Sequence, residues 1–188
     1  GTQGFVECEF PLFPYLVGQL YKLFGLHEWF GRGLSILFSI LTIILVIRIG
    51  SRIFDPFSGW WGGVFFALLP LNIYYGRTFQ AESLLIFLAA LSIDRLFAWK
   101  NGSNLIALLI SWLAFCLACL IKILPLIWLG LPLIVTHACL SKNNLLRSKK
   151  ELKKRIYQVA TSPYVWIYSL SAIVIGLIWF SYAYGLGL

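Results

Sequence analysis

The sequence predicts an all-α membrane protein, a polytopic bundle of about six transmembrane helices preceded by an interfacial amphipathic helix on the outer face. Hydrophobic residues make up 60% of the 188 positions and charged residues 12%, whereas soluble proteins have about 25% charged residues. The mean hydropathy is +0.86. A soluble globule of this composition would expose large apolar patches, and the long uncharged stretches suit a bilayer instead.

Six apolar stretches give the predicted spans. The shortest, residues 33–47, can cross a hydrocarbon core of about 30 Å when the side chains of Arg32 and Arg48 extend to the interface. The fourth and fifth are continuous in pattern, and we expect the chain to break at Lys122 and Pro125, because proline interrupts a helix. The spans are residues 33–47, 56–76, 77–99, 101–121, 123–141 and 164–184.

Residues 1–32 have a different pattern and form the first predicted unit, an outer-face loop with an interfacial helix. The stretch from Pro11 to Phe24 is apolar but too short to span a membrane. Its apolar residues recur near one helical face, which is typical of a helix lying in the membrane surface. They are Leu12, Leu16, Leu20, Leu23 and Phe24. Residues 33–188 form the second unit, the transmembrane bundle, with a basic cytoplasmic loop at 141–158.

The net charge of +8 is unevenly placed, and its placement predicts the orientation. Seven of the 15 basic residues lie between Lys142 and Arg155, in a loop that we assign to the cytoplasm because positively charged loops stay inside. Alternating the spans from there leaves all of the excess positive charge on the inner side. Anionic lipid headgroups explain this loop, so nucleic-acid binding is not expected.

Two features of composition bear on completeness and redox chemistry. Methionine is absent, including at position 1, so we expect an internal fragment of a larger membrane domain.

Cys116 and Cys119 form a C-x-x-C motif inside an apolar run, with no second pair, histidine or carboxylate nearby. We interpret them as small apolar residues of a membrane helix rather than as a redox or metal site.

Ionisable residues collect at the outer ends of the predicted spans, where charge at membrane level is costly and often marks a site. The cations can hold a lipid phosphate, and the carboxylates can serve a metal, a base or a hydroxyl-rich ligand. Interfacial anchoring and ion pairing among the same residues are the alternative. The set consists of Glu7, Glu9, Arg32, Arg77, Glu82 and Lys122.

Five short motifs follow one another between about Phe5 and Leu133. They are Glu7–Leu16, Leu23–Gly25, Gly31–Ser35, Leu69–Arg77 with Glu82, and Ile121–Lys122 with Pro125. In order and spacing they resemble the membrane glycosyltransferases of the GT-C superfamily. The resemblance is strongest to glycosyltransferase family 39, the dolichyl-phosphate-mannose protein mannosyltransferase and aminoarabinose lipid A transferase type.

The resemblance implies site residues. It assigns a supporting catalytic role to Glu9 and Arg32. Glu9 matches a carboxylate that in some members helps to hold a divalent metal, so a divalent metal is the cofactor that the resemblance makes possible. Arg77, Glu82 and Lys122 match polar positions around the donor cavity, and we group Glu7 with them as substrate-binding. The family's catalytic Asp precedes the Glu-x-Pro segment. No Asp occurs before Asp55, so we expect it upstream of this chain, which alone should be inactive.

The resemblance implies transfer of a sugar from a polyprenyl-phosphate donor to a lipid, glycan or protein acceptor, with inversion. We expect an integral, multi-pass protein of the cell envelope, in the bacterial inner or plasma membrane, with its active face outside and membrane lipids as partners. A transporter or lipid flippase whose cavity uses the same charges is the alternative. Transporters often show internal repeats and midplane sites, whereas these charges lie at one face and no repeat is evident.

Overall fold

A computed structural model describes residues 10–102, 104–122 and 163–185, and every regular element in these ranges is an α-helix. The helices are α1 (Leu12–Phe24), α2 (Trp29–Ile53), α3 (Pro56–Leu68), α4 (Pro70–Arg77), α5 (Glu82–Gly102), α6 (Leu105–Ile121) and α9 (Pro163–Gly185). The predicted fold class, an all-α helical membrane bundle, is confirmed. The predicted fifth span and the basic loop lie outside the described residues.

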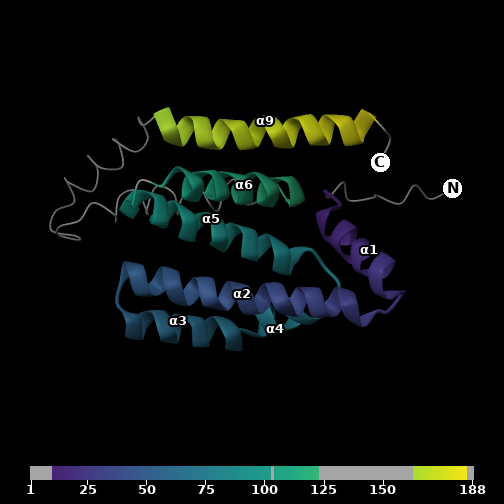
Figure 1. Cartoon of the computed structure of the whole chain (residues 1–188), viewed down its shortest axis with the longest axis horizontal. Coiled ribbons are helices and arrows are strands. Elements are labelled where there is room, and N and C mark those ends of the chain that lie inside the picture. The colour runs from purple at the N-terminus through teal and green to yellow at the C-terminus, as the bar shows by residue number, and fades with distance from the viewer. Residues whose placement is uncertain (1–9, 103, 123–162, 186–188) are drawn as a thin grey trace.

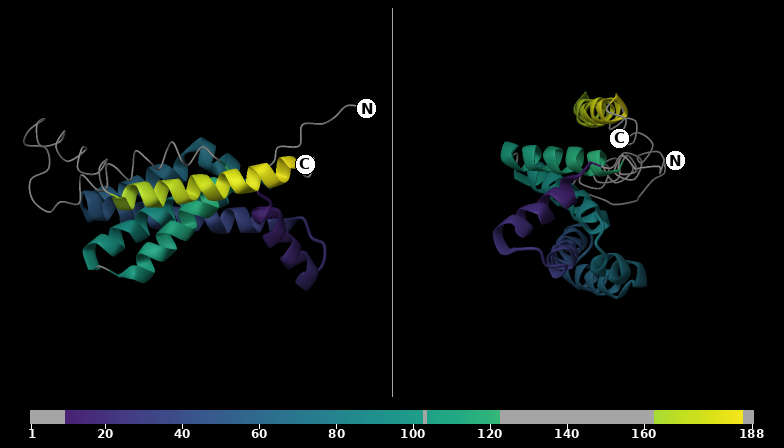
Figure 2. Two further views of the ribbon diagram at one scale, coloured as in Figure 1. Left: turned by 90° about the horizontal axis from the view of Figure 1, so that it is seen from above. Right: turned by 90° about the vertical axis from the view of Figure 1, so that its right-hand side faces the viewer.

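The helices form a layered bundle with α2 and α5 at its centre (Figure 1). Helices α3 and α4 cover one side of α2, α5 packs on its other side, and α6 and α9 follow beyond α5. Helix α1 crosses one end of this stack at a steep angle (Figures 1 and 2). From α1 to α6, consecutive helices are therefore neighbours, as their short connections require.

Helix α2 is the described helix that is long and apolar enough to cross a membrane by itself. It contains 25 residues, so it extends over about 37 Å at 1.5 Å per residue, more than the thickness of the hydrocarbon core. The predicted span 33–47 lies within it. The shorter apolar helices Leu105–Ile121 and Ile173–Tyr182 fall within the predicted spans 101–121 and 164–184. The total number of spans stays a prediction.

The second predicted span, residues 56–76, is broken into two helices. Helix α3 ends at Leu68, and Leu69 has an extended backbone with φ −62° and ψ 122°. The cause is Pro70, which lacks an N–H and disfavours helical backbone in the residue before it. The Asn72 side chain caps the freed end by donating to the Phe66 carbonyl at 3.2 Å. Two short helices therefore replace one continuous span.

A helix forms at the predicted place as α1, and it packs on the bundle through residues outside the predicted apolar face. Phe13 and Val17 are its buried residues, each 1% exposed, whereas Leu23 and Phe24 are exposed. The reason is that α1 packs against the bundle near its beginning, where the Phe13 and Phe79 rings meet edge to face at 5.5 Å. Its last turn extends past the core and ends at Gly25, whose φ of 88° suits glycine.

Helices α2 and α3 pack closely because glycine lies at their contact. Asp55 starts α3 by accepting bonds from the backbone N–H and hydroxyl of Ser58, which lower its pKa. One turn on, Gly59 lies against α2: a Cβ there would come 2.1 Å from Ser51 Oγ and 2.6 Å from the Ile47 carbonyl oxygen. Position 59 therefore has no room for a side chain.

Helices α5, α6 and α9 are joined by polar contacts between otherwise apolar faces. The buried Ser111 hydroxyl donates to the Ser92 carbonyl at 2.7 Å, and the Trp112 indole donates to the Ser171 hydroxyl at 2.8 Å. Cys116 and Cys119 are buried free thiols that pack with Phe115 in the same layer. Their surroundings agree with the interpretation of this motif as helix-packing residues.

We expect Gly59→Ala to lower the free energy of unfolding by about 1–3 kcal/mol, because the added methyl group meets the α2 backbone. Gly62→Ala is the matched control on the same helix. Its Cβ would have no neighbour closer than 4.0 Å, and alanine should raise helix stability by up to about 1 kcal/mol. Thermal unfolding of the purified variants in detergent measures both. Equal effects of the two substitutions would contradict the packing described.

Candidate functional site

One end of the bundle brings together α1, the start of α2, the loop between α4 and α5, and the end of α6. The Ser35 hydroxyl in α2 donates to the Thr78 carbonyl at 2.9 Å. A Cβ on Gly31 would lie 2.0 Å from the Phe79 ring, so that ring rests directly on the first turn of α2. Beneath these contacts, Phe13, Leu84 and Ile121 belong to one buried cluster.

An ion pair joins two of the predicted substrate-binding residues at this end. Lys122 Nζ lies 2.6 Å from Glu82 Oε1, with the two side chains 27% and 21% exposed. The helix ends explain the positions: α6 stops at Ile121, and Glu82 occupies the first turn of α5, where the helix dipole favours a carboxylate. For these two residues, the ion pairing that was the alternative to ligand binding is observed.

The other predicted site residues are not joined to this pair. Arg32 in the first turn of α2 and Arg77 at the end of α4 are exposed, and neither has a hydrogen bond or ion pair with another described residue. Glu7 and Glu9 lie outside the described residues. In the described part of the chain, no three His, Cys, Asp or Glu side chains group as metal ligands, which leaves the expectation of a metal at Glu9 untested.

A buried hydroxyl adjoins the ion pair. Ser83, next to Glu82 in α5, is 3% exposed, and its hydroxyl has no hydrogen-bond partner among the described residues. A buried polar atom left without a partner is costly. The first turn of α5 thus presents a carboxylate and an unused hydroxyl side by side in sequence.

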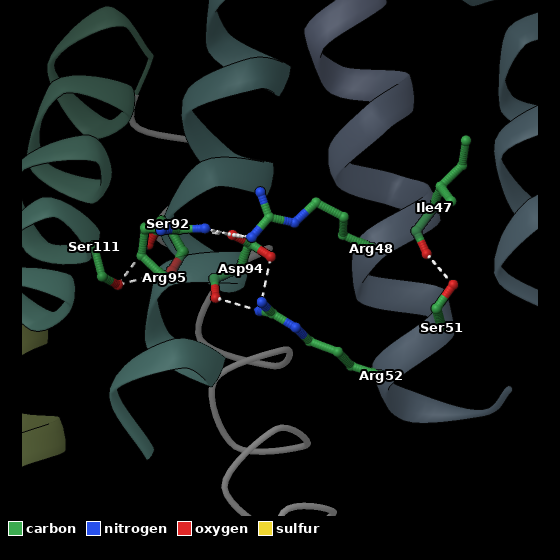
Figure 3. Close-up of polar contacts among 8 residues, drawn as sticks. All are labelled: Ile47, Arg48, Ser51, Arg52, Ser92, Asp94, Arg95 and Ser111. Carbon is green, nitrogen blue, oxygen red and sulfur yellow. Dashed lines mark hydrogen bonds and ion pairs between the residues drawn. The ribbon is translucent and has the colours of Figure 1, made fainter. Parts of the chain in front are cut away.

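A second charged cluster, which the sequence reasoning missed, surrounds Asp94 in α5 (Figure 3). Asp94 is fully buried. Arg52 donates to Asp94 Oδ1 at 2.8 Å and to the Asp94 carbonyl at 3.0 Å, Arg95 donates from Nε to Oδ2 at 2.9 Å, and Arg48 lies 3.5 Å from Oδ2. Arg48 and Arg52 share one face of α2 because they are four residues apart. That spacing, opposite an acidic residue within a predicted span, was the available signal.

The two charged regions lie at opposite ends of α2. Arg32 and Arg52 are twenty positions apart in this helix, a rise of about 30 Å and thus about one hydrocarbon thickness. The first region contains the Glu82–Lys122 pair, and the exposed Arg32 and Arg77 belong to helices that meet the others at this end. The second contains a carboxylate held by three arginines.

Comparison with known proteins identifies the family of this chain. No curated protein and no solved structure matches it. The family model described as dolichyl-phosphate-mannose-protein mannosyltransferase matches residues 9–181, a range that contains α1 to α6 and most of α9. The match covers far more than half of the chain, and it agrees with a described part that is all helical and contains a helix, α2, long and apolar enough to cross a membrane. The chain therefore belongs to the dolichyl-phosphate-mannose-protein mannosyltransferase family of membrane glycosyltransferases.

Proposed function

We propose that this chain takes part in moving a sugar from a polyprenyl-phosphate donor to a lipid, glycan or protein acceptor at the outer or lumenal membrane face. The observation that carries the proposal is the family match over residues 9–181, which begins at Glu9 and includes Arg32, Arg77, Glu82 and Lys122. Further support comes from the described charges at one end of the bundle, beside an interfacial helix that can face the headgroups.

The chemistry is a single displacement at the anomeric carbon. An acceptor hydroxyl or amine attacks that carbon, the bond from the carbon to the phosphate oxygen breaks, and the acceptor's proton passes to a carboxylate base. The phosphate leaves on its polyprenyl chain with one more negative charge than it had as a diester. Cations held in place before the reaction stabilise that developing charge.

In this proposal Arg32, Arg77 and Lys122 are the cations facing the donor phosphate. Arg32 and Arg77 have exposed side chains that are free of described partners, so binding a phosphate breaks no ion pair that they already make. Lys122 differs, because a phosphate there competes with Glu82. Glu9 would orient the acceptor or hold a divalent metal, and Glu7 would contact substrate.

We expect Glu9→Gln in the full-length protein to reduce turnover by about two orders of magnitude, because the amide keeps the shape but loses the charge. Arg32→Lys should also be poorly tolerated, since a point charge does not replace a planar fork on phosphate. The assay uses a purified polyprenyl-phosphate sugar and a defined acceptor. Glu28→Gln, at an exposed carboxylate that makes no cap bond at the start of α2, is the matched control. Near-normal turnover in both site variants would remove these residues from the site.

Lys122 and Glu82 give a second test, because a phosphate bound to Lys122 competes with the Glu82 carboxylate in the ion pair. Lys122→Met should weaken donor binding about tenfold, through loss of a charge-assisted contact to phosphate. Glu82→Gln releases Lys122 from its carboxylate, so donor affinity should be unchanged or higher. Calorimetric titration with the donor measures both affinities, and thermal unfolding measures stability. If both variants lose stability equally and neither changes donor affinity, the pair is only structural.

The face of action can be tested by labelling. Lys22 and Ser58 are exposed residues near opposite ends of α2. In a variant whose native cysteines are replaced by serine, Lys22→Cys should react with a membrane-impermeant maleimide in intact cells. Ser58→Cys should react only after permeabilisation, because the basic loops are expected inside. The reverse pattern would invert the orientation, and labelling of both from outside would contradict a spanning α2.

A further inference from the structure

The arginines around Asp94 carry more positive charge than that one carboxylate balances. Three guanidinium groups, from Arg48, Arg52 and Arg95, face a single carboxylate. The carboxylate is fully buried and the arginine side chains are 45%, 30% and 25% exposed, so the cluster is only partly open to solvent. Excess positive charge at the edge of a membrane attracts an anion from outside this cluster.

The hydrogen bonds within the cluster leave arginine donors unused. Asp94 Oδ1 is taken by Arg52, and Oδ2 is taken by Arg95. Each guanidinium has several N–H donors, far more together than one carboxylate can accept. Arg48 makes the longest contact, 3.5 Å to Oδ2, and has the most exposed side chain of the three. It is therefore the arginine most available to a further anion.

No other described carboxylate is free to balance the cluster. Asp55 follows α2 closely, but its two oxygens accept bonds from the Ser58 N–H and hydroxyl. Glu82 is bound to Lys122 at the opposite end of α5, and Glu28 precedes the other end of α2. The counter-ion that this end of the bundle requires is thus not found among the described residues.

The cluster stands near the level at which lipid headgroups begin. Arg52 is next to the last residue of α2, and the chain continues with Phe54, Phe57 and Trp60, which are 73%, 71% and 64% exposed. Exposed aromatic residues beyond a spanning helix are typical of the membrane–water interface. The abundant anion at that level is a lipid phosphate, whose oxygens match the planar fork of arginine.

We propose that Arg48, with Arg52 and Arg95, binds the phosphate headgroup of an anionic phospholipid in the leaflet at this end of the bundle. The site is separate from the proposed sugar-transfer site, because Arg48 is sixteen residues along α2 from Arg32, a rise of about 24 Å. Asp94 holds the three guanidiniums together, and the lipid phosphate supplies the missing negative charge. Loss of this site leaves the proposed donor-binding residues intact, so the two proposals fail independently.

The test measures lipids retained by the full-length protein when native mass spectrometry releases it from nanodiscs of phosphatidylcholine mixed with phosphatidylglycerol. The wild type should retain phosphatidylglycerol preferentially. Arg48→Gln should weaken that retention about tenfold, the effect of losing one charged contact. Arg48→Lys keeps the charge without the fork, and it should retain the lipid less well than the wild type. Lys22→Gln removes a surface cation from α1 at the other end of the molecule and should change nothing.

Three results would overturn the proposal. The first is equal retention of phosphatidylcholine and phosphatidylglycerol by the wild type. The second is a loss of phosphatidylglycerol that is the same in Arg48→Gln and Lys22→Gln, or an Arg48→Lys variant that behaves as wild type, since either result indicates diffuse charge attraction only. The third concerns a soluble source: if inorganic phosphate in detergent protects the wild type against heat as well as phosphatidylglycerol does, the ligand is free phosphate.

Discussion

The buried carboxylate of Asp94 determines how α2 and α5 fit together, because a charge removed from water has to be met by cations from the neighbouring helix. Arg48 and Arg52 reach it from successive turns of α2, and Arg95 reaches it from α5 itself. A shift of α2 by one turn would move one of the two arginines out of reach. At the far end of α2, Ser35 bonds to Thr78 just before α5 begins. Helix α2 is thus fixed near both ends by polar contacts, and the apolar surfaces between them pack in one register.

This register also sets the position of the proposed sugar-transfer site. With α2 fixed against α5, the first turn of α2 lies under Phe79, and α1 packs its Phe13 ring against the same residue. Glu82 then begins α5 close to the end of α6, where Lys122 can reach it. The predicted site residues in the described chain belong to this end because α2 and α5 begin there while α4 and α6 end there.

The sequence was sufficient to predict the helical membrane class and the approximate course of α1, α2, α5, α6 and α9, since long apolar stretches between charges have few other solutions. It was not sufficient where one residue decides the local geometry. Pro70 divides the second predicted span. The hydrophobic pattern on either side of it continues without interruption, so the pattern alone does not predict the break. The pairing of Lys122 with Glu82 and the burial of Asp94 depend on which helices are neighbours, information that no periodicity contains. Glu7 and Glu9 fall outside the described residues, so their roles stay predictions.

In the proposed reaction, the charges at the site suit the product better than the donor. Arg32, Arg77 and Lys122, the cations proposed to face the donor phosphate, provide three positive charges, one of which is paired with Glu82. The donor phosphate is a diester with about one negative charge, whereas the released polyprenyl phosphate is a monoester with about 1.5 to 2 at pH 7. The electrostatic attraction therefore increases as the bond to the sugar breaks, and stabilisation that is stronger in the transition state than in the ground state accelerates the step. The Glu82–Lys122 pair adds a further element, because it holds Lys122 in place at the edge of an apolar core until a phosphate competes for it.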